Sequence, residues 1–325
     1  MAEPIWRDKL YTLPSDKNAF RILCGNEVIY TGTAVKRPNA SINQVRINDI
    51  CADYIANSLP LLPTIPTLPV SFDIEIQAMG NWQLAGTIQF LNDWSYEDGY
   101  NPTASGMSFP ILPIVARGQI VPFTRISSAN VIARLYFSGT STQKTMALPT
   151  DANKYTDSFI RTLATSGWGG VSVEVAANSS YTSMKIGSGR EYEIRDCVKY
   201  VLYYINAYGG MDWFPILGNT QEGDSVERNV CDLDVNNTNR TRSRRELQNT
   251  ITKTFTFHSG ILTDEQSAMM HHLLDSTEVY LHDLVEQRVD PVLITSTSHD
   301  YPRFRNGKRP NEYTIMVEYA NKHTR

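Results

Sequence analysis

Residues 247–284 read LQNTITKTFTFHSGILTDEQSAMMHHLLDSTEVYLHDL and contain the clearest succession of structural elements in the chain. Leu247 to His258 is rich in Thr, Ile and Phe, which predicts a β-strand that ends at Ser259-Gly260. A short helix is predicted over 263–275, and Glu278 to Leu284 predicts the next strand. This order of strand, helix and strand indicates a compact α+β unit.

The helix in this stretch carries its own start signal. Thr263 followed by Gln266 is the pattern of a capping box, in which each side chain accepts a hydrogen bond from the backbone N–H of the other residue. Asp264 and Glu265 place negative charge in the first turn, where the helix dipole favours it. The apolar face comprises Met269, Met270, Leu273 and Leu274. Because so short a helix is not stable alone, we expect this face to pack on the neighbouring strands.

Most of the remaining chain predicts strands. Asp16 to Tyr30 indicates two strands joined by a tight turn, and Val70 to Met79 alternates apolar and polar residues before its hairpin partner, Trp82 to Leu91. Ile194 to Asn206 has apolar residues on both faces, which is typical of a strand covered on both sides. One further short helix is predicted over Ile47 to Ile55, where apolar residues recur at helical spacing.

These patterns predict a mainly β fold of β-sandwich-like domains, with one short helix packed on the carboxyl-terminal α+β unit. Pro291 to Thr297 and Tyr313 to Tyr319 supply the last strands of that unit. A break in the pattern near 188–193 divides the chain into a β-rich domain, 1–190, and a β-rich α+β domain, 191–325.

A proline cluster interrupts the first domain at 59–69. Pro60, Pro63, Pro66 and Pro69 occupy every third position, which matches one turn of polyproline II. Because proline donates no backbone hydrogen bond, the segment is predicted to be an extended connector rather than a strand inside a sheet. Its period of three also suits a segment that binds a partner through an aromatic groove, and the sequence leaves this alternative open.

The composition describes a globular chain of 325 residues, with 41% hydrophobic and 20% charged residues. The formal net charge is −4, whereas general nucleic-acid binding requires a strongly basic surface, so we expect no such function. No run of about 18 apolar residues predicts a membrane span. The first ten residues lack the features of a secretory signal, so synthesis in the cytoplasm is expected.

No residue pattern predicts a catalytic, cofactor or metal site. The four cysteines are far apart in the sequence and are expected to be free thiols: Cys24, Cys51, Cys197 and Cys231. The histidines of the last third lack zinc-ligand spacing: His271, His272, His282 and His299. The carboxylate pairs Asp73/Glu75 and Asp232/Asp234 could share one face of a strand, as in a glycosidase, but a solvated face is the commoner explanation.

The best candidate for partner contacts is the polar segment from Gly218 to Arg245, which we predict to be a long irregular loop or arm. Its basic residues, Arg240, Arg242, Arg244 and Arg245, could contact an acidic surface on a neighbouring subunit, or simply face solvent. Aromatic residues in loop-like contexts are further interface candidates, because Trp, Tyr and Arg are common anchors: Trp94, Tyr96 and Trp213.

Several stretches resemble virion or tail-associated proteins encoded by phages and prophages of Bacteroides-type gut bacteria. They are Phe255–Gln266, Leu273–Ser276, Val279–Leu284 and Pro291–Thr295, together with Asn206–Trp213 and Phe90–Tyr96. The resemblance implies a β-rich, non-enzymatic subunit of the tail, tail tip or neck, built into a homo-oligomeric ring with other virion proteins. By analogy of size and layout, a distal-tail or baseplate-hub protein is the nearest match. It also implies localisation to the virion after synthesis in the host cytoplasm.

Two other functions stay open at the level of sequence. A receptor- or carbohydrate-binding β-sandwich module at the tail tip would present exposed Trp and Tyr side chains on one rigid face. A glycan hydrolase would need a cleft with two carboxylates, one of them with a raised pKa.

Overall fold

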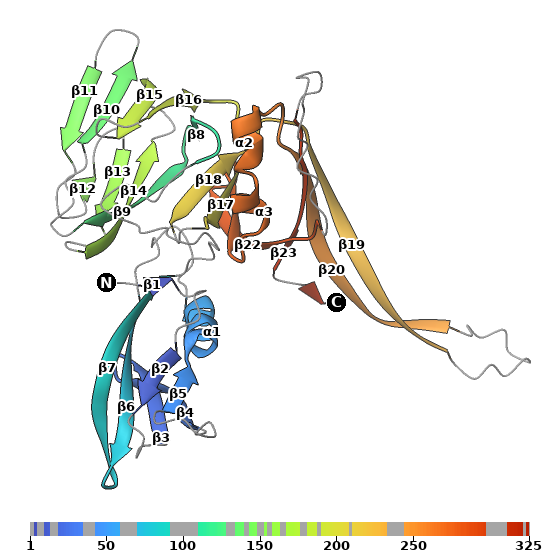
Figure 1. Cartoon of the computed structure of the whole chain (residues 1–325). Helices are drawn as coiled ribbons and strands as arrows, with labels where there is room; N and C mark the ends of the chain where they lie inside the picture. Colours follow the sequence, from blue (N-terminus) through green and yellow to red (C-terminus); the bar gives the residue numbers. More distant parts are fainter. Residues whose placement is uncertain are drawn as a thin grey trace, which may run out of the picture. The chain divides into compact units, whose positions relative to one another are not determined.

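The computed structural model describes most of the chain, which Figure 1 shows coloured along the sequence. The described residues are 3–4, 10–13, 19–34, 43–58, 70–91, 110–127, 134–139, 143–147, 153–154, 158–162, 167–175, 181–186, 190–207, 210–232, 244–296, 311–320 and 323–324. Most of them lie in antiparallel sheets, which confirms the predicted mainly β fold. The predicted connector at 59–69 lies outside the described residues.

The chain divides into two compact units that are not consecutive halves of the sequence. The first contains Met1–Pro110, Ile120–Glu193 and Ile205–Asp212. The second contains Ile111–Gln119, Ile194–Tyr204 and Trp213–Arg325.

The first unit begins with a five-stranded sheet of order β1-β7-β6-β3-β4. Its strands are β1 (Glu3–Pro4), β3 (Ala19–Cys24), β4 (Glu27–Thr33), β6 (Val70–Ala78) and β7 (Asn81–Leu91). Both predicted hairpins are confirmed. Gly25 has a φ of 59° in the first turn, and Met79 and Gly80 have φ values of 51° and 84° in the second. Positive φ at both central residues, as in the second turn, is typical of a turn whose twist matches that of the flanking strands.

Helix α1 (Asn48–Ser58) and the pair β2 (Leu10–Leu13) and β5 (Asn43–Arg46) close the core of this first sheet. The helix confirms the prediction over Ile47 to Ile55. Apolar side chains from the sheet and the helix are almost fully buried together: Leu13, Phe20, Ile22, Ile47, Cys51, Ile55, Phe72, Ile74 and Phe90.

The middle of the chain contributes further antiparallel strands. One set follows the order β12 (Asn153–Lys154), β13 (Ser158–Thr162), β14 (Gly167–Val175) and β9 (Ile120–Ser127). Another runs β11 (Gln143–Ala147), β10 (Arg134–Gly139), β15 (Tyr181–Ile186) and β16 (Glu191–Arg195). In the second unit, strand β8 (Ile114–Ala116) ends just before Arg117. The backbone N–H of Arg117 donates a hydrogen bond to the carbonyl of Arg195, at 2.9 Å.

The second unit is built on an eight-stranded sheet of order β18-β17-β21-β22-β23-β20-β19, in which β24 also pairs with β20. Its strands are β17 (Tyr200–Ile205), β18 (Met211–Pro215), β19 (Thr220–Asp232), β20 (Arg244–His258), β21 (Val279–Asp283), β22 (Arg288–Ile294), β23 (Thr314–Tyr319) and β24 (His323–Thr324). Every residue of β17 is buried, which confirms the predicted burial on both faces. The prediction of one strand over Ile194 to Asn206 is wrong, because β16 ends at Arg195 and β17 begins only at Tyr200.

One face of this sheet packs against the short helices α2 (Asp264–Ala268) and α3 (His271–Leu274), which lie side by side with it in Figure 1. The predicted apolar face is confirmed, since Met270, Leu273 and Leu274 are buried and Met269 packs against the same core. The prediction of one helix over 263–275 needs a correction. The Met270 N–H donates to the Ser267 carbonyl, three residues back, and this tighter turn separates α2 from α3.

The capping box is confirmed in both directions. The Gln266 backbone N–H donates to Thr263 Oγ1 at 3.2 Å, and the Thr263 backbone N–H donates to Gln266 Oε1 at 2.9 Å.

Thr263→Ala should therefore lower the free energy of unfolding by about 1 kcal/mol. Urea denaturation measures the loss, with Thr263→Ser as the control that keeps the hydroxyl. Equal stability of the Ala and Ser variants would contradict a stabilising role for this cap.

Candidate functional site

The most distinctive feature of the second unit is a long hairpin formed by β19 and β20, which we call the arm. The two strands pair from Thr220↔Phe257 to Asp232↔Arg244, with a bulge between Asn229 and Val230. Figure 1 shows the arm in gold and orange, extending away from the helices of its own unit. The predicted irregular loop from Gly218 to Arg245 is therefore wrong in conformation, because Thr220–Asp232 is a continuous strand.

The arm loses its other strand partners with distance from the core. β20 pairs with β23 over Thr254–His258 and with β24 at Thr250 and Ile251. Among the described residues, the part of β20 from Arg244 to Asn249 pairs only with β19. An isolated two-stranded ribbon is marginally stable in water, so this outer part would gain stability from a further contact.

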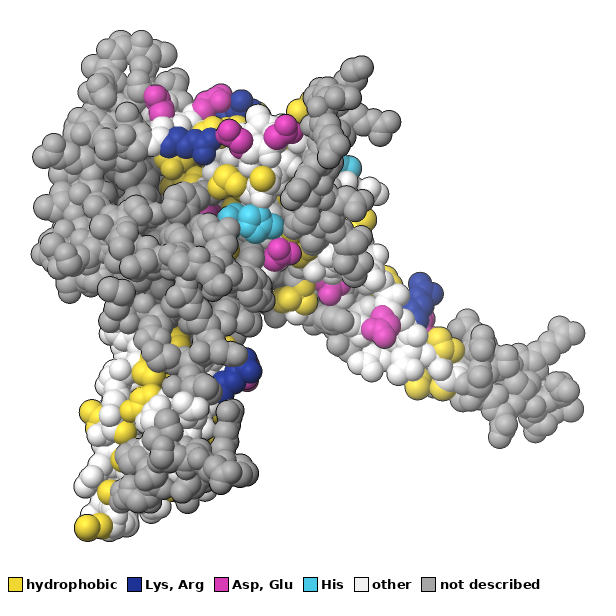
Figure 2. All heavy atoms as spheres, in the orientation of Figure 1, with side chains coloured by type: hydrophobic (Ala, Val, Ile, Leu, Met, Phe, Trp, Pro, Cys, Tyr) yellow, Lys and Arg dark blue, Asp and Glu magenta, His cyan; other side chains and the backbone are white. Residues whose placement is uncertain are grey.

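The arm is also unusually exposed, and several of its exposed side chains are apolar. Every residue of β19 from Thr220 to Val230 is exposed. The exposed fractions are 43% for Val226, 49% for Val230 and 62% for Leu247. Figure 2 shows hydrophobic side chains beside charged ones near the end of the described part of the arm. Burying one Val or Leu fully is worth about 1.5–3 kcal/mol, so covering the arm would stabilise an assembly appreciably.

The root of the arm is held by a polar cluster on its first strand. Lys199 Nζ lies 2.9 Å from Glu222 Oε1, and the Tyr200 hydroxyl donates to the same oxygen at 2.5 Å. These hydrogen bonds lower the pKa of Glu222, with Tyr200 the larger contributor. Burial raises the pKa of Tyr200 to about 12, so its hydroxyl stays a donor at neutral pH. The cluster therefore connects Tyr200, the first residue of β17, and the preceding Lys199 to the exposed strand β19.

An aromatic cluster holds the root from the core side. The Tyr200 ring centroid lies 5.8 Å from that of Phe255 and 5.5 Å from that of Phe257. The two Phe rings are stacked at 5.6 Å. Buried aromatic pairs of this geometry contribute beyond their area, so the inner end of β20 is fixed while its outer end is exposed.

The structure separates the predicted interface residues into three groups. Trp94, Tyr96, Arg240 and Arg242 lie outside the described residues. Arg244 and Arg245 begin β20, where the backbone register places them opposite Asp232 and Cys231 on the arm.

Trp213 forms the third group and requires a correction. Its side chain is fully buried, and Nε1–H donates to the Ile114 carbonyl at 2.9 Å. A Trp with its polar atom satisfied inside the core anchors its own unit, so Trp213 is not available to a neighbouring subunit.

Sequence reasoning missed the exposed apolar residues of the arm. Val226 and Val230 are four residues apart, a spacing that fits one face of a strand, but the surrounding Glu, Asp, Arg and Asn residues indicated a polar loop. Leu247 was predicted correctly as part of a strand. Its exposure follows from the length of β20 beyond the core, which the sequence pattern does not reveal.

Three of the carboxylates and histidines considered at the sequence level have the structural partners given below, whereas Asp234 and His299 lie outside the described residues. Asp73 Oδ1 accepts from Thr87 Oγ1 at 2.6 Å, and Glu75 pairs with Arg21 at 2.5 Å. His282 Nδ1 lies 3.1 Å from the Tyr203 hydroxyl, and both side chains are buried. Within the described ranges, no group of three or more His, Cys, Asp or Glu side chains is arranged to hold a metal ion.

Comparisons with known proteins add no family assignment: no family model matches the chain, and neither does any curated protein. Among the described helices, none has the length and hydropathy required to cross a membrane.

At the start of the arm, Gly218 lies close to the backbone of His258, and this predicts the effect of adding a side chain at position 218. A Cβ on Gly218 would clash with the backbone carbonyl of His258, whereas a Cβ on Gly223 would meet only Thr254 Oγ1, at 3.4 Å. Gly218→Ala should therefore destabilise the protein by about 1–3 kcal/mol, with Gly223→Ala as the near-neutral control. Thermal unfolding measures both. A tolerated Ala at 218 would show that the root of the arm can shift.

Two buried histidines predict the acid response of the second unit. Burial lowers the pKa of His272, and likewise that of His282, to about 4. Between this value and about 6.5, the unfolded chain binds protons that the folded chain does not, so stability falls as pH falls through this window. Urea denaturation between pH 7 and 4 should show a shallower loss for the His272→Gln/His282→Gln variant than for His258→Gln. Equal slopes would contradict the assignment.

Proposed function

We propose that this chain is a non-enzymatic structural subunit of a phage virion, placed in the tail, tail tip or neck and assembled through its arm. The observation that carries the proposal is the β19–β20 hairpin, whose outer part has exposed apolar side chains and, in the described chain, no third strand. A projecting hairpin of this kind allows a subunit to contact a neighbouring subunit at a distance from its own core.

The resemblance to phage virion proteins supports the same function from the sequence. The resembling stretches include the inner end of β20 with the start of α2, and strands β21 and β22. They therefore fall on the elements that build the core of the second unit and hold the root of the arm. The resemblance is structural rather than catalytic, in keeping with an assembly protein.

A ring is the assembly that this proposal favours. A subunit with a projecting element on one side and a receiving surface on another makes head-to-tail contacts, and such contacts close into a ring when the rotation between neighbours permits. The expected partners are further copies of the chain and other virion proteins.

The test is the protein content of purified particles. Phage particles produced by the strain that carries the gene should contain the chain in a fixed ratio to the other structural proteins. Mass spectrometry of the purified particles measures this ratio. Particles that lack the chain would contradict the proposal, and a glycan-array screen of the purified protein would then test the carbohydrate-binding alternative.

An arm-shortened variant sharpens this test. Arg228 and Asn249 lie opposite each other in the register, so residues 229–248 can be replaced by an Asn-Gly turn without changing the inner pairing. The variant should fold, as judged by circular dichroism and a cooperative melt, but should not enter particles in a complementation assay. A full-length chain with Gly223→Ala is the control. Normal incorporation of the shortened chain would show that the arm is dispensable.

A further inference from the structure

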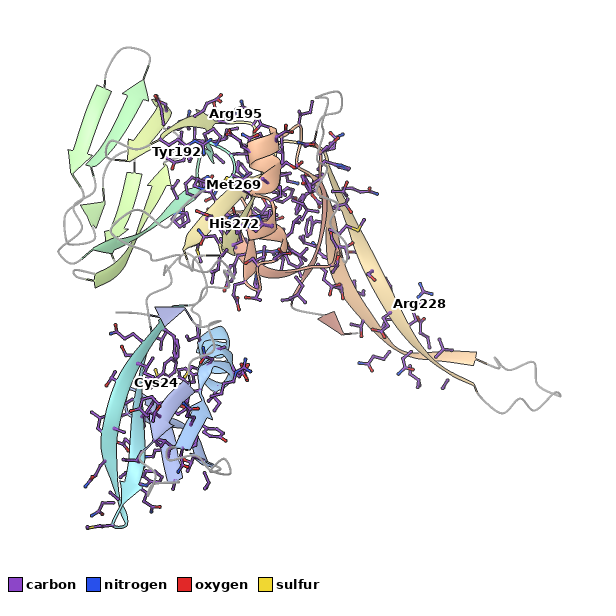
Figure 3. All side chains as sticks on the ribbon, in the orientation of Figure 1. Cys24, Tyr192, Arg195, Arg228, Met269 and His272 are labelled. Carbon is purple, nitrogen blue, oxygen red and sulfur yellow. The ribbon has the colours of Figure 1, made fainter. Side chains whose placement is uncertain are left out.

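On the outer part of the arm, one face carries apolar residues around Arg228, which is paired with Glu246. Val226, Arg228 and Val230 share a face of β19 because side chains alternate along a strand. The register places Ile251 opposite Val226 on the same face, and Leu247 is the extra residue of β20 at the bulge beside Val230. We call these five residues the arm strip. Arg228 is labelled in Figure 3, on the part of the arm beyond the pairing with β23.

A second exposed apolar surface lies on β22 and β23. Leu293 is directly opposite Glu318, and Met316 lies two residues before Glu318 in β23, so all three face the same way. Leu293 and Met316 are each 49% exposed. The alternate residues Ile315 and Val317 are buried in the core, so this patch is on the face of the sheet away from α2 and α3. We call these three residues the sheet patch.

The arm strip and the sheet patch cannot meet within one chain. Ile251 is an even number of residues from Phe255 and Phe257, so the strip continues the core-side face of β20. The sheet patch is on the opposite face, since Thr256 on β20 is the register partner of Met316. Because the two surfaces are on opposite faces of one sheet, the strip and the patch of the same chain do not contact each other in the described part of the structure.

Resting on the assembly function proposed above, we propose that the arm strip of one subunit docks on the sheet patch of a second copy. The two surfaces are complementary in charge as well as apolar, because Arg228 lies between Val226 and Val230, while Glu318 is the register partner of Leu293 and lies two residues after Met316. Opposite charges aligned between apolar groups fix the register of a contact. When every subunit makes this contact with its neighbour, each arm strip and each sheet patch is covered.

Arg228 can exchange its present partner for Glu318 at little cost. Its Nε lies 3.4 Å from Glu246 Oε1, and the two side chains are 65% and 41% exposed. Ion pairs between exposed side chains contribute little to stability. The pair with Glu246 therefore holds Arg228 on the arm strip, and breaking it costs little free energy. A contact on the sheet patch would exclude water from the new pair and strengthen it.

The experiment is a charge exchange measured as self-association of the full-length chain. Analytical ultracentrifugation over micromolar to millimolar concentrations gives the dissociation constant. Arg228→Glu and Glu318→Arg should each weaken association about tenfold or more, and Leu247→Ser should do the same. The double variant Arg228→Glu/Glu318→Arg should recover most of the wild-type affinity. Glu227→Arg, on the other face of β19, is the matched control and should leave the affinity unchanged.

Each outcome has a defined meaning. Weakening by the single variants with recovery in the double variant supports docking of the strip on the patch, and recovery also excludes misfolding as the cause. Association that none of the variants changes overturns the inference, as does weakening without recovery. A wild-type chain that stays monomeric overturns it too, whereas the virion function is judged separately by the content of purified particles.

Discussion

The packing of Tyr200 against Phe255 and Phe257 is the contact on which the rest of the second unit depends. It fixes the inner end of β20 in the core, and β20 is the strand to which β19, β23 and β24 all pair. The same Tyr200 hydroxyl donates to Glu222 on β19, so one residue holds both strands of the arm. Beyond the residues that pair with β23 and β24, the described part of β20 has only β19 beside it, so the position of the arm depends on this anchored inner end.

The division of β20 into a buried end and an exposed end has a direct physical origin. Only the residues over the helices find apolar neighbours, and the strand continues well beyond them. Hydrogen bonding to β19 satisfies the backbone groups on one edge of β20 there, but it does not cover the side chains of Leu247 or Val226. Exposed apolar groups on a regular strand are a source of binding free energy that is realised only when another surface covers them. This is why we attach the assembly function to the arm rather than to the core.

Local patterns predicted many elements well. The capping pair Thr263 and Gln266, the Gly25 turn and the alternation of Val70 to Ala78 all depend on contacts between near neighbours, and each is present. The predictions failed where long-range context decides. The charged residues of β19 suggested a loop, yet thirteen register pairs with β20 make it a strand. Trp213 suggested an interface anchor, yet its indole is buried against residues about a hundred positions earlier in the chain.

The sequence by itself determined the mainly β class, the start of α2 and the positions of the two hairpins that turn at Gly25 and Gly80, because periodicity, turn residues and caps act over a few residues. It did not determine which face of a strand is exposed at the end of a sheet. The tertiary structure alone decided that Val226, Val230 and Leu247 are uncovered, that Leu293 and Met316 are on the opposite face, and that Trp213 is internal. These properties depend on which distant strands pair and where the core ends, and no local pattern encodes either.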